Sequence, residues 1–310
     1  MRATDTTVAA SMHRAPAGLS RHAAFLSLVI VAIAWFWGPL STVINLSLRY
    51  GEYEHYSHIV IIPVISLFLI YLRRDAIFAE VQSGARLGAL IMVVAITASW
   101  LPRILRIDDA NAWTVAIVCM VAMVIGAFLL CYGAPAFKKA AFGLLFLLFM
   151  VPLPPFMLHA IIGFLQRASA EASALIFDLI GVPVFRQGFV FALPGLTIEI
   201  AEECSGIRSS IALFIVGLVA AHLYLRSTWG KVVVALAAVP VAIMKNSVRI
   251  VVLSMLGIHV DSGFVGPGLL HRNSGIPVFA MAFAILGAII WLLHKSEAWL
   301  DRRAATAAGS

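Results

Sequence analysis

The chain has 310 residues, of which 62% are hydrophobic and only 12% are charged, and its formal net charge at pH 7 is +7. A soluble domain carries about 25% charged residues, so this composition excludes a soluble globular protein and indicates a polytopic membrane protein. The positive charge does not indicate a nucleic-acid partner, because most Lys and Arg residues stand in short clusters between apolar runs, where they set membrane orientation.

The apolar runs predict an all-α membrane protein with about eight transmembrane helices, because a helix needs about 20 apolar residues to cross a bilayer core. The predicted spans are Ala23–Leu48, His58–Leu72, Leu87–Leu101, Ala112–Tyr132, Ala140–Val151, Ile207–Leu225, Val232–Ile258 and Pro277–His294. Residues 1–22 are expected to form a disordered cytoplasmic tail without a cleavable signal peptide, since the first apolar run is too long for one. Residues 23–296 are expected to form a single transmembrane domain, and residues 297–310 a second cytoplasmic tail.

Basic residues fall in alternate loops, and this pattern predicts the orientation of the chain. The basic positions are Arg14 and Arg21, Arg73, Arg74 and Arg86, Lys138 and Lys139, Arg226 and Lys231, and Lys295, Arg302 and Arg303. The positive-inside rule makes these loops cytoplasmic, so both termini are expected on the cytoplasmic side. The chain is then a multi-pass protein of the inner (plasma) membrane, surrounded by lipid. The intervening loops, including the long segment from Pro152 to Glu203, then face the extracytoplasmic side.

The long segment begins with a helical, fairly apolar stretch, Phe156–Ile180. It carries Gln166, Arg167, Glu171 and Asp178, which make it too polar for a comfortable span. If this stretch crossed the membrane, the basic loops beyond it would lie outside, so we expect an amphipathic helix on the outer surface, with an embedded helix left open. Gln187-Gly188 and Pro194-Gly195 then punctuate β-prone runs, which predicts a short extended or hairpin element.

The residues after this element, from Glu202 to Ser210, concentrate reactive groups directly before an apolar run. Cys204 is expected in the first turn of the following helix, where unpaired N–H groups and the helix dipole favour a thiolate nucleophile. Glu202 and Glu203 oppose the thiolate, so a reactive Cys204 requires a cationic partner. A buried cysteine without chemistry is the alternative. Cys119 and Cys131 lie within apolar runs and are expected to be inert, with no disulfide or zinc pattern.

The next predicted helix carries Lys245, Asn246 and Arg249, whose spacing places them on one helix face. A centred Lys or Arg costs about 2.5–3.5 kcal/mol even on the lenient insertion scale, so these residues are functional candidates. Arg249 lies nearer the level of Cys204, and an ion pair with Glu202 or Glu203 is its structural alternative. His271, in the following outer loop, is placed to act as a general base and acid, unless it is a solvated bystander.

At this point the sequence resembles the exosortase/archaeosortase family of membrane cysteine transpeptidases. The stretches that carry the resemblance are Tyr56-Ser57-His58 with Pro63, Phe149-Met150-Val151-Pro152-Leu153-Pro154, Gly181-Val182-Pro183-Val184 with Arg186 and Gly188, Glu203-Cys204-Ser205-Gly206-Ile207-Arg208, Asn246 with Arg249, and His271. They cover roughly residues 56–275. Two departures are Ile59, where many relatives have Gly, and the absence of a soluble domain after the last span.

The resemblance implies a catalytic triad of Cys204, Arg249 and His271 that works without a metal or other cofactor. It also implies that the partners are exported proteins with a C-terminal sorting signal: a motif such as Pro-Glu-Pro, a transmembrane helix and a basic end. Five residues are candidates for substrate binding: Arg208, Tyr56, His58, Glu203 and Asn246. For Arg208 the alternative is an ion pair with Glu203, and for Tyr56 and His58 it is interfacial anchoring. The oligomeric state and the acceptor nucleophile are not predicted.

Two rival interpretations remain open. A transporter would use the intramembrane Lys and Arg along an anion path, but transporters commonly show internal repeats and interrupted helices in two halves, and this sequence displays neither. A non-catalytic membrane factor for polysaccharide assembly would need no reactive thiol. Fast, pH-dependent alkylation of Cys204 from the outer side distinguishes an enzyme from such a factor.

Overall fold

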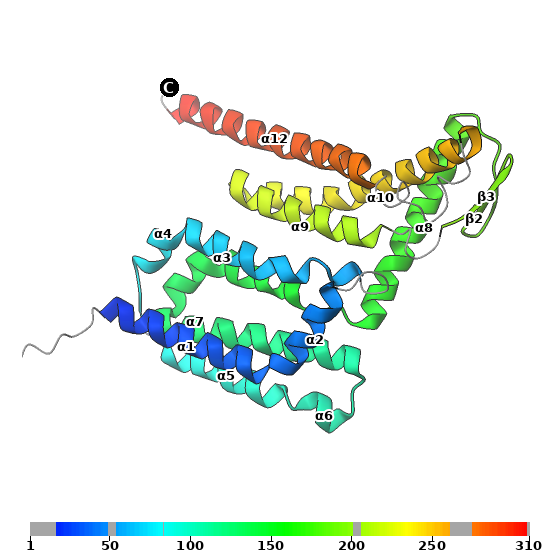
Figure 1. Cartoon of the computed structure of the whole chain (residues 1–310). Coiled ribbons are helices and arrows are strands. Elements are labelled where there is room, and N and C mark those ends of the chain that lie inside the picture. Colours follow the sequence, from blue (N-terminus) through cyan, green and yellow to red (C-terminus); the bar gives the residue numbers. More distant parts are fainter. Residues whose placement is uncertain (1–16, 49–53, 83, 201–205, 261–274, 309–310) are drawn as a thin grey trace, which may run out of the picture. The chain divides into compact units, whose positions relative to one another are not determined.

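The computed structural model describes residues 17–48, 54–82, 84–200, 206–260 and 275–308 as helices and one small sheet (Figure 1). Contacts divide the chain into two compact units, Met1–Pro154 and Pro155–Ser310, which are described in turn. The single transmembrane domain expected over residues 23–296 stays a prediction. Helix α1 begins at Ala17, so residues 17–22 are helical and the expected disordered tail is too long at that end.

The described residues of the first unit form seven α-helices and three short 3-10 helices. The α-helices are α1 (Ala17–Trp35), α2 (Trp37–Leu48), α3 (Ile62–Leu72), α4 (Arg74–Phe78), α5 (Ala85–Ala98), α6 (Leu101–Leu105) and α7 (Asp109–Phe146). The 3-10 helices are η1 (Glu54–Tyr56), η2 (Ile59–Ile61) and η3 (Leu147–Met150). The run Ala23–Leu48, expected as one span, is instead a pair of helices that meet at an angle of 76°.

Gly133 interrupts α7 between the two predicted spans Ala112–Tyr132 and Ala140–Val151. Its backbone is non-helical, with φ 80° and ψ 177°, a conformation that residues with a side chain rarely adopt. A Cβ atom at this position would also lie 2.3 Å from the carbonyl oxygen of Gln82. Both constraints require glycine, so the sequence divides this long apolar stretch at the place where the chain must change direction.

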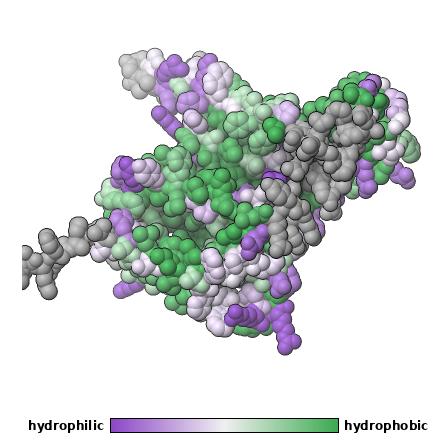
Figure 2. All heavy atoms as spheres, viewed as in Figure 1, coloured by the Kyte–Doolittle hydropathy of each residue, from purple (hydrophilic) through white to green (hydrophobic). Residues whose placement is uncertain are grey.

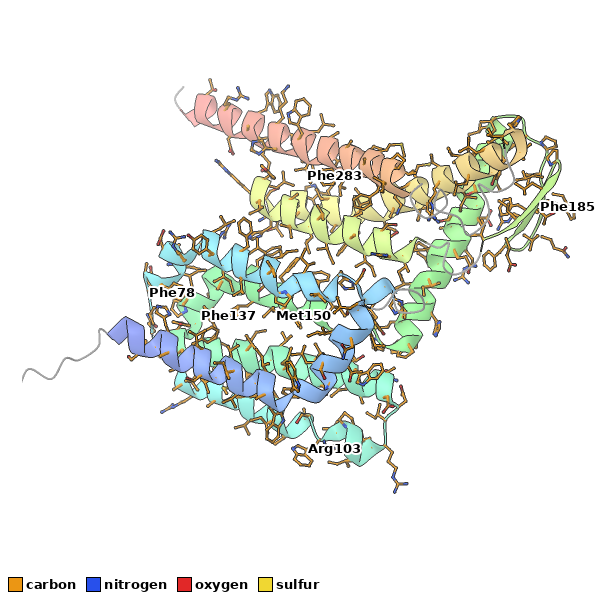
Figure 3. All side chains as sticks on the ribbon, in the orientation of Figure 1. Phe78, Arg103, Phe137, Met150, Phe185 and Phe283 are labelled. Atoms are coloured by element: carbon orange, nitrogen blue, oxygen red, sulfur yellow. The ribbon has the colours of Figure 1, made fainter. Side chains whose placement is uncertain are left out.

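A cluster of rings beside this interruption forms much of the core of the first unit. The fully buried ring of Tyr132 lies 5.0 Å from Phe78 and 4.8 Å from Phe128, measured between ring centroids (Phe78 is labelled in Figure 3). Its hydroxyl is hydrogen-bonded to Nδ1 of His22 at 2.7 Å. The polar tip of a buried tyrosine therefore has a partner, as a low-dielectric interior requires.

The second unit contains α8 (Pro155–Leu179), a small sheet, α9 (Ile207–Tyr224), α10 (Thr228–His259) and α12 (Gly275–Ala308). The antiparallel strands β1 (Phe185–Gln187), β2 (Val190–Leu193) and β3 (Leu196–Glu199) follow one another in the order β1-β2-β3. Gly188 and Gly195 have φ angles of 63° and 74° in the two connecting turns. This sheet confirms the predicted β-element and its turn residues.

The inner face of the sheet packs against α8 and α10 through one hydrophobic cluster. Phe191 of β2, Ile198 of β3 and Ile200 just beyond the sheet are buried with Phe177 of α8 and Val251 of α10. The register pairs Phe191 with Ile198, so the two strands present these side chains together. On the opposite side, the ring of Phe185 is 73% exposed (Figure 3).

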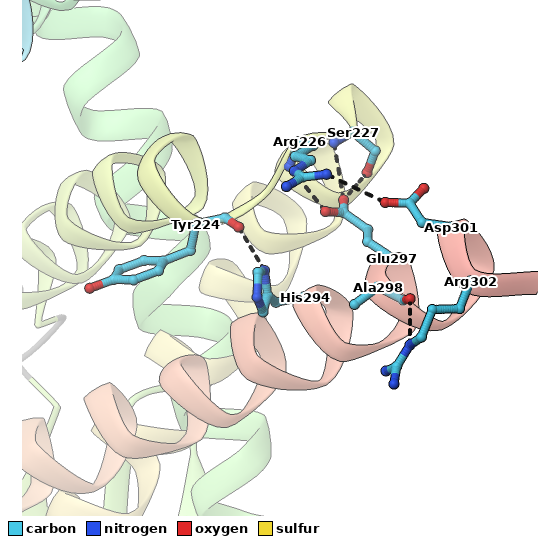
Figure 4. A network of polar contacts seen from close by, with 8 residues as sticks. All are labelled: Tyr224, Arg226, Ser227, His294, Glu297, Ala298, Asp301 and Arg302. Carbon is cyan, nitrogen blue, oxygen red and sulfur yellow. Dashed lines mark hydrogen bonds and ion pairs between the residues drawn. The ribbon is translucent and has the colours of Figure 1, made fainter. Parts of the chain in front are cut away.

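The turn between α9 and α10 is fastened to α12 by a polar network (Figure 4). The backbone N–H groups of Arg226 and Ser227 each donate to the Glu297 carboxylate at 3.0 Å, and the Ser227 hydroxyl donates to it as well. The ring of His294 is hydrogen-bonded to the carbonyl of Tyr224 at 2.9 Å. The N-cap of α10 is Ser227, whose hydroxyl accepts from the Gly230 N–H at 3.0 Å, so Glu297 holds this N-cap residue and joins the three helices.

Within the described residues, six helices are long and apolar enough to cross a membrane, and the bent pair α1–α2 would add a seventh. These six include α8 and count α7 once, while the apolar helix Ile59–Leu72 is too short for the same criterion. Figure 2 shows broad hydrophobic areas on the visible face. The expectation of an all-α polytopic membrane protein is therefore confirmed, and the outer-surface location of α8 stays a prediction.

Candidate active site

The predicted site residues fall into three groups in the structure. Arg208, Asn246 and Arg249 belong to the second unit and are described below. Tyr56 and His58 belong to the first unit. The third group lies outside the described residues and consists of Cys204, Glu203 and His271. It includes the thiol and the proposed base of the triad. Their roles stay predictions, while the residues that flank Cys204 on either side can be examined directly.

On the C-terminal side of Cys204, α9 begins at Ile207 and its N-cap is Gly206, with φ 70° and ψ 19°. Cys204 itself lies outside the described residues, so its expected place in the first turn of this helix stays a prediction. The Gly206 carbonyl accepts hydrogen bonds from the hydroxyls of Ser209 and Ser210 at 3.0 and 2.8 Å, and from the Ser210 N–H at 2.9 Å. Three donors thus fix the point at which the chain enters α9.

Asn246 of α10 lies directly against this N-cap. A Cβ atom on Gly206 would lie 2.8 Å from Asn246 Oδ1, so the side chain fills the space that the glycine leaves. Asn246 is 1% exposed, and its Nδ2 donates to the hydroxyl of Ser169 on α8 at 3.1 Å. Gly206 of the Cys-Ser-Gly-Ile-Arg block and Asn246 of the Asn-x-x-Arg block are therefore neighbours in space.

On the N-terminal side of Cys204, the chain is held by α8. Gln166 Nε2 donates to the carbonyl of Ile200 at 2.6 Å, and both residues are buried. Ser169, one turn further along α8, accepts from Asn246 through its hydroxyl and from the Ser247 hydroxyl through its carbonyl at 3.1 Å. Helix α8 thus contacts both the segment that leads to Cys204 and the helix that carries Arg249.

The sequence interpretation missed the roles of Gln166 and Ser169. It treated Gln166 only as a residue too polar for a membrane span. The spacing of Gln166, Ser169 and Ser173 could have revealed these roles, because it places three polar side chains on one face of the helix. All three are buried, at 8%, 0% and 0% exposure, so the face that carries these three side chains is turned toward the protein.

Lys245 is also brought to this site. It is 3% exposed, and its ammonium donates a hydrogen bond to the Ser209 hydroxyl of α9. Among the described residues, no carboxylate forms an ion pair with it. The ammonium is therefore linked through Ser209 to the carbonyl of Gly206, two residues beyond Cys204 in the sequence.

The two arginines of the site differ in exposure. Arg249 is partly buried on α10, one turn beyond Lys245, whereas Arg208 is exposed in the first turn of α9. The ion pairs that the sequence offers as alternatives for them involve Glu202 and Glu203, which lie outside the described part of the chain, so these alternatives stay untested. Across the described ranges, no group of three or more His, Cys, Asp and Glu side chains is placed to hold a metal ion.

In the first unit, Tyr56 and His58 surround His55. The ring of Tyr56 lies 4.1 Å from that of His55 between centroids, and Nδ1 of His58 is hydrogen-bonded to the His55 carbonyl at 2.9 Å. Tyr56 is 7% exposed. A residue in an interfacial aromatic belt contacts lipid headgroups, so the burial of Tyr56 argues against that alternative. Contact of Tyr56 or His58 with a substrate stays a prediction.

The comparison with protein families supports the resemblance that the motifs suggest. A family model described as transmembrane exosortase matches residues 50–288, a range that contains every motif from Tyr56 to His271. No curated protein and no solved structure matches the chain.

Proposed function

Because this chain belongs to the transmembrane exosortase family, we propose that it is a cysteine transpeptidase that cleaves the C-terminal sorting signal of exported proteins. The substrates carry a Pro-Glu-Pro-type motif followed by a transmembrane helix and a basic end. Cleavage takes place at the extracytoplasmic side of the inner membrane. The substrate class is taken from the resemblance to the family, and the side of the membrane from the distribution of basic loops.

The reaction proceeds through a thioester at Cys204. The thiolate attacks the carbonyl carbon of the scissile peptide bond, and Arg249 stabilises the negative charge on the thiolate or on the developing oxyanion. The C–N bond then breaks as His271 protonates the departing amine, which leaves the acyl group on sulfur. A second nucleophile, deprotonated by His271, attacks the thioester and releases Cys204 as the thiolate.

The remaining candidates recognise the substrate. Arg208, in the first turn of α9, offers an exposed guanidinium for a substrate carboxylate. Glu203 precedes the nucleophile in the sequence and Asn246 lies one helical turn before Arg249, while Tyr56 and His58 of the first unit supply further contacts to the substrate. Asn246 contacts the N-cap of α9 rather than open solvent, so its contribution is to shape the site around the substrate.

One observation carries the proposal. Gly206 and Asn246 are 40 positions apart in the sequence, yet a Cβ atom on Gly206 would lie 2.8 Å from Asn246 Oδ1. Gly206 of the nucleophile block and Asn246 of the cation block are therefore in contact, and this contact supports a shared site for the two blocks. A membrane scaffold or a transporter has no requirement for such a shared site, whereas a thiolate that directly follows two glutamates in the sequence needs a nearby cation.

The test is processing of a tagged substrate with a C-terminal sorting signal in membranes that contain the enzyme. Cys204→Ala is expected to abolish processing, and Arg249→Ala and His271→Ala to slow it about 10³-fold or more, as in other sites whose catalytic groups act as a unit. Cys131→Ala removes a buried thiol that is distant from Cys204 in the sequence, and it serves as the matched control. Wild-type protein should also yield a hydroxylamine-sensitive acyl adduct on Cys204. Undiminished processing by Cys204→Ala would refute the proposal.

A further inference from the structure

The geometry points to Lys245 as a positioning residue that acts through Ser209 on the Gly206 carbonyl and so fixes the chain directly after Cys204. This role rests on the proposed function, since it concerns the same nucleophile. It is distinct from the triad, because Lys245 acts on the backbone of the site and not on the reacting atoms.

The location of Lys245 makes a purely structural role costly. The residue lies 18 positions into α10 (Thr228–His259), a helix long and apolar enough to cross a membrane, and is only 3% exposed. Desolvating an ammonium in such a place is unfavourable by several kcal/mol unless nearby groups compensate. A methionine of similar length would fill the same space without that penalty. The charge is therefore expected to serve a purpose other than packing.

The partner of the ammonium shows what that purpose is. A hydroxyl has two acceptor sites but a single proton. Because Lys245 donates to the Ser209 oxygen, the Ser209 proton is available for another acceptor, and it is donated to the Gly206 carbonyl at 3.0 Å. Donation by a charged group polarises the hydroxyl and strengthens this second bond. The positive charge is thus transmitted to the N-cap residue of α9.

The N-cap is the part of the site where precise placement has most effect. Gly206 is held in the left-handed region at φ 70°, and Cys204 precedes it by two residues. The Gly206 carbonyl belongs to the peptide that joins Gly206 to Ile207, so a change in its direction alters ψ of Gly206 and with it the direction in which the preceding chain leaves α9. Displacement of a reacting group by about 1 Å can slow a reaction about 10²-fold. A weakened Lys245–Ser209–Gly206 chain is therefore expected to slow catalysis without affecting substrate affinity.

The experiment is a double-mutant cycle with Lys245→Met and Ser209→Ala, read out as kcat and KM of substrate processing in vesicles. Each single variant is expected to lower kcat about tenfold at an unchanged KM. The double variant should be no slower than either single variant, since both interrupt the same chain of hydrogen bonds. Ser209→Thr, which keeps the hydroxyl, should restore most of the rate.

Two controls separate this role from a structural one. Ser254→Ala removes another buried hydroxyl from α10, one that donates to the Ile250 carbonyl at 2.7 Å, and its effect should multiply independently with that of Lys245→Met. Lys245→Met should also unfold no more readily than the wild type, because it removes a buried charge.

The inference is overturned if Lys245→Met retains the full rate, or if its effect and that of Ser209→Ala multiply. It is also overturned if the loss of rate merely follows a loss of folded protein. Activity of Cys204→Ala measured in the same vesicles decides the proposed function separately. An active Cys204→Ala refutes the thioester mechanism, whereas an inactive Cys204→Ala with a fully active Lys245→Met refutes only the role of Lys245.

Discussion

Replacement of Gly206 by alanine is the sharpest test of the packing around the nucleophile segment. The alanine must adopt the left-handed backbone at φ 70°, which costs roughly 1–2 kcal/mol for a residue with a Cβ atom. The new Cβ would also lie 2.8 Å from Oδ1 and 3.0 Å from Cγ of Asn246. Asn246 cannot easily move away, because it is 1% exposed and is hydrogen-bonded to Ser169. Overpacking of this kind adds about 1–3 kcal/mol.

The total loss of unfolding free energy is therefore about 2–5 kcal/mol, and matched variants separate its two causes. Gly188 and Gly195 have φ angles of 63° and 74°, and a Cβ atom at either position meets nothing within 4 Å. Gly188→Ala and Gly195→Ala should therefore lose only the backbone contribution. Adding Asn246→Ala to Gly206→Ala should recover the packing contribution, since only the Asn246 Cβ, at 3.5 Å, would remain in contact.

The assay is denaturant-induced unfolding of the purified protein in mixed micelles, accompanied by the rate of substrate processing. Gly206→Ala is expected to reduce that rate well beyond what its loss of folded protein explains, because the substitution displaces the chain two residues after Cys204. If Gly206→Ala loses no more stability than Gly195→Ala, the contact with Asn246 does not constrain the N-cap and the reasoning is refuted.

Two further substitutions test other parts of the structure. Gln166→Leu removes the donor to the buried Ile200 carbonyl, which should cost about 1–3 kcal/mol of unfolding free energy and slow processing. The control is Ser173→Ala on the same face of α8, which should be nearly neutral because the buried Ser173 hydroxyl has no hydrogen-bond partner among the described residues. Equal effects of the two variants would contradict the role of Gln166. Gly133→Ala should destabilise the first unit by at least about 3 kcal/mol in the same unfolding assay, since its Cβ would lie 2.3 Å from the Gln82 carbonyl oxygen at φ 80°; near-wild-type stability would contradict that placement.

Much of the fold could be predicted because it depends on local sequence signals. Apolar runs predicted α9, α10 and α12 to within a few residues at their starting ends. The glycines after Gln187 and Pro194 predicted turns, since they adopt the left-handed conformations that such turns require. In these helices and turns, the residues that determine the local structure belong to that same helix or turn.

The features that escaped prediction depend on residues far apart in the sequence. The 76° bend between α1 and α2 is an exception, because the local dipeptide Gly38-Pro39 directly after the bend signals a break that the expectation of a single span overlooked. The close fit at the start of α9 joins the left-handed Gly206 to Asn246 of the next helix, 40 positions further along the sequence. The hydrogen bond from Gln166 to Ile200 joins residues 34 positions apart. Hydrophobic periodicity carries no information about such pairings.

Polar contacts between helices have a particular value in this protein, because lipid offers apolar side chains as favourable an environment as a neighbouring helix does. Apolar packing alone therefore specifies helix register weakly, whereas a misplaced buried amide or hydroxyl loses its partner. Here three contacts connect Ile200 to Gly206 through α8 and α10. Gln166 of α8 is hydrogen-bonded to Ile200, Asn246 of α10 is hydrogen-bonded to Ser169 of α8, and Asn246 also packs on Gly206. Residues 201–205 lie between Ile200 and Gly206, so the position of both ends of the nucleophile segment depends on the register of α8 against α10. Polar-to-apolar substitutions along this interface should consequently reduce the rate of processing more than they reduce stability.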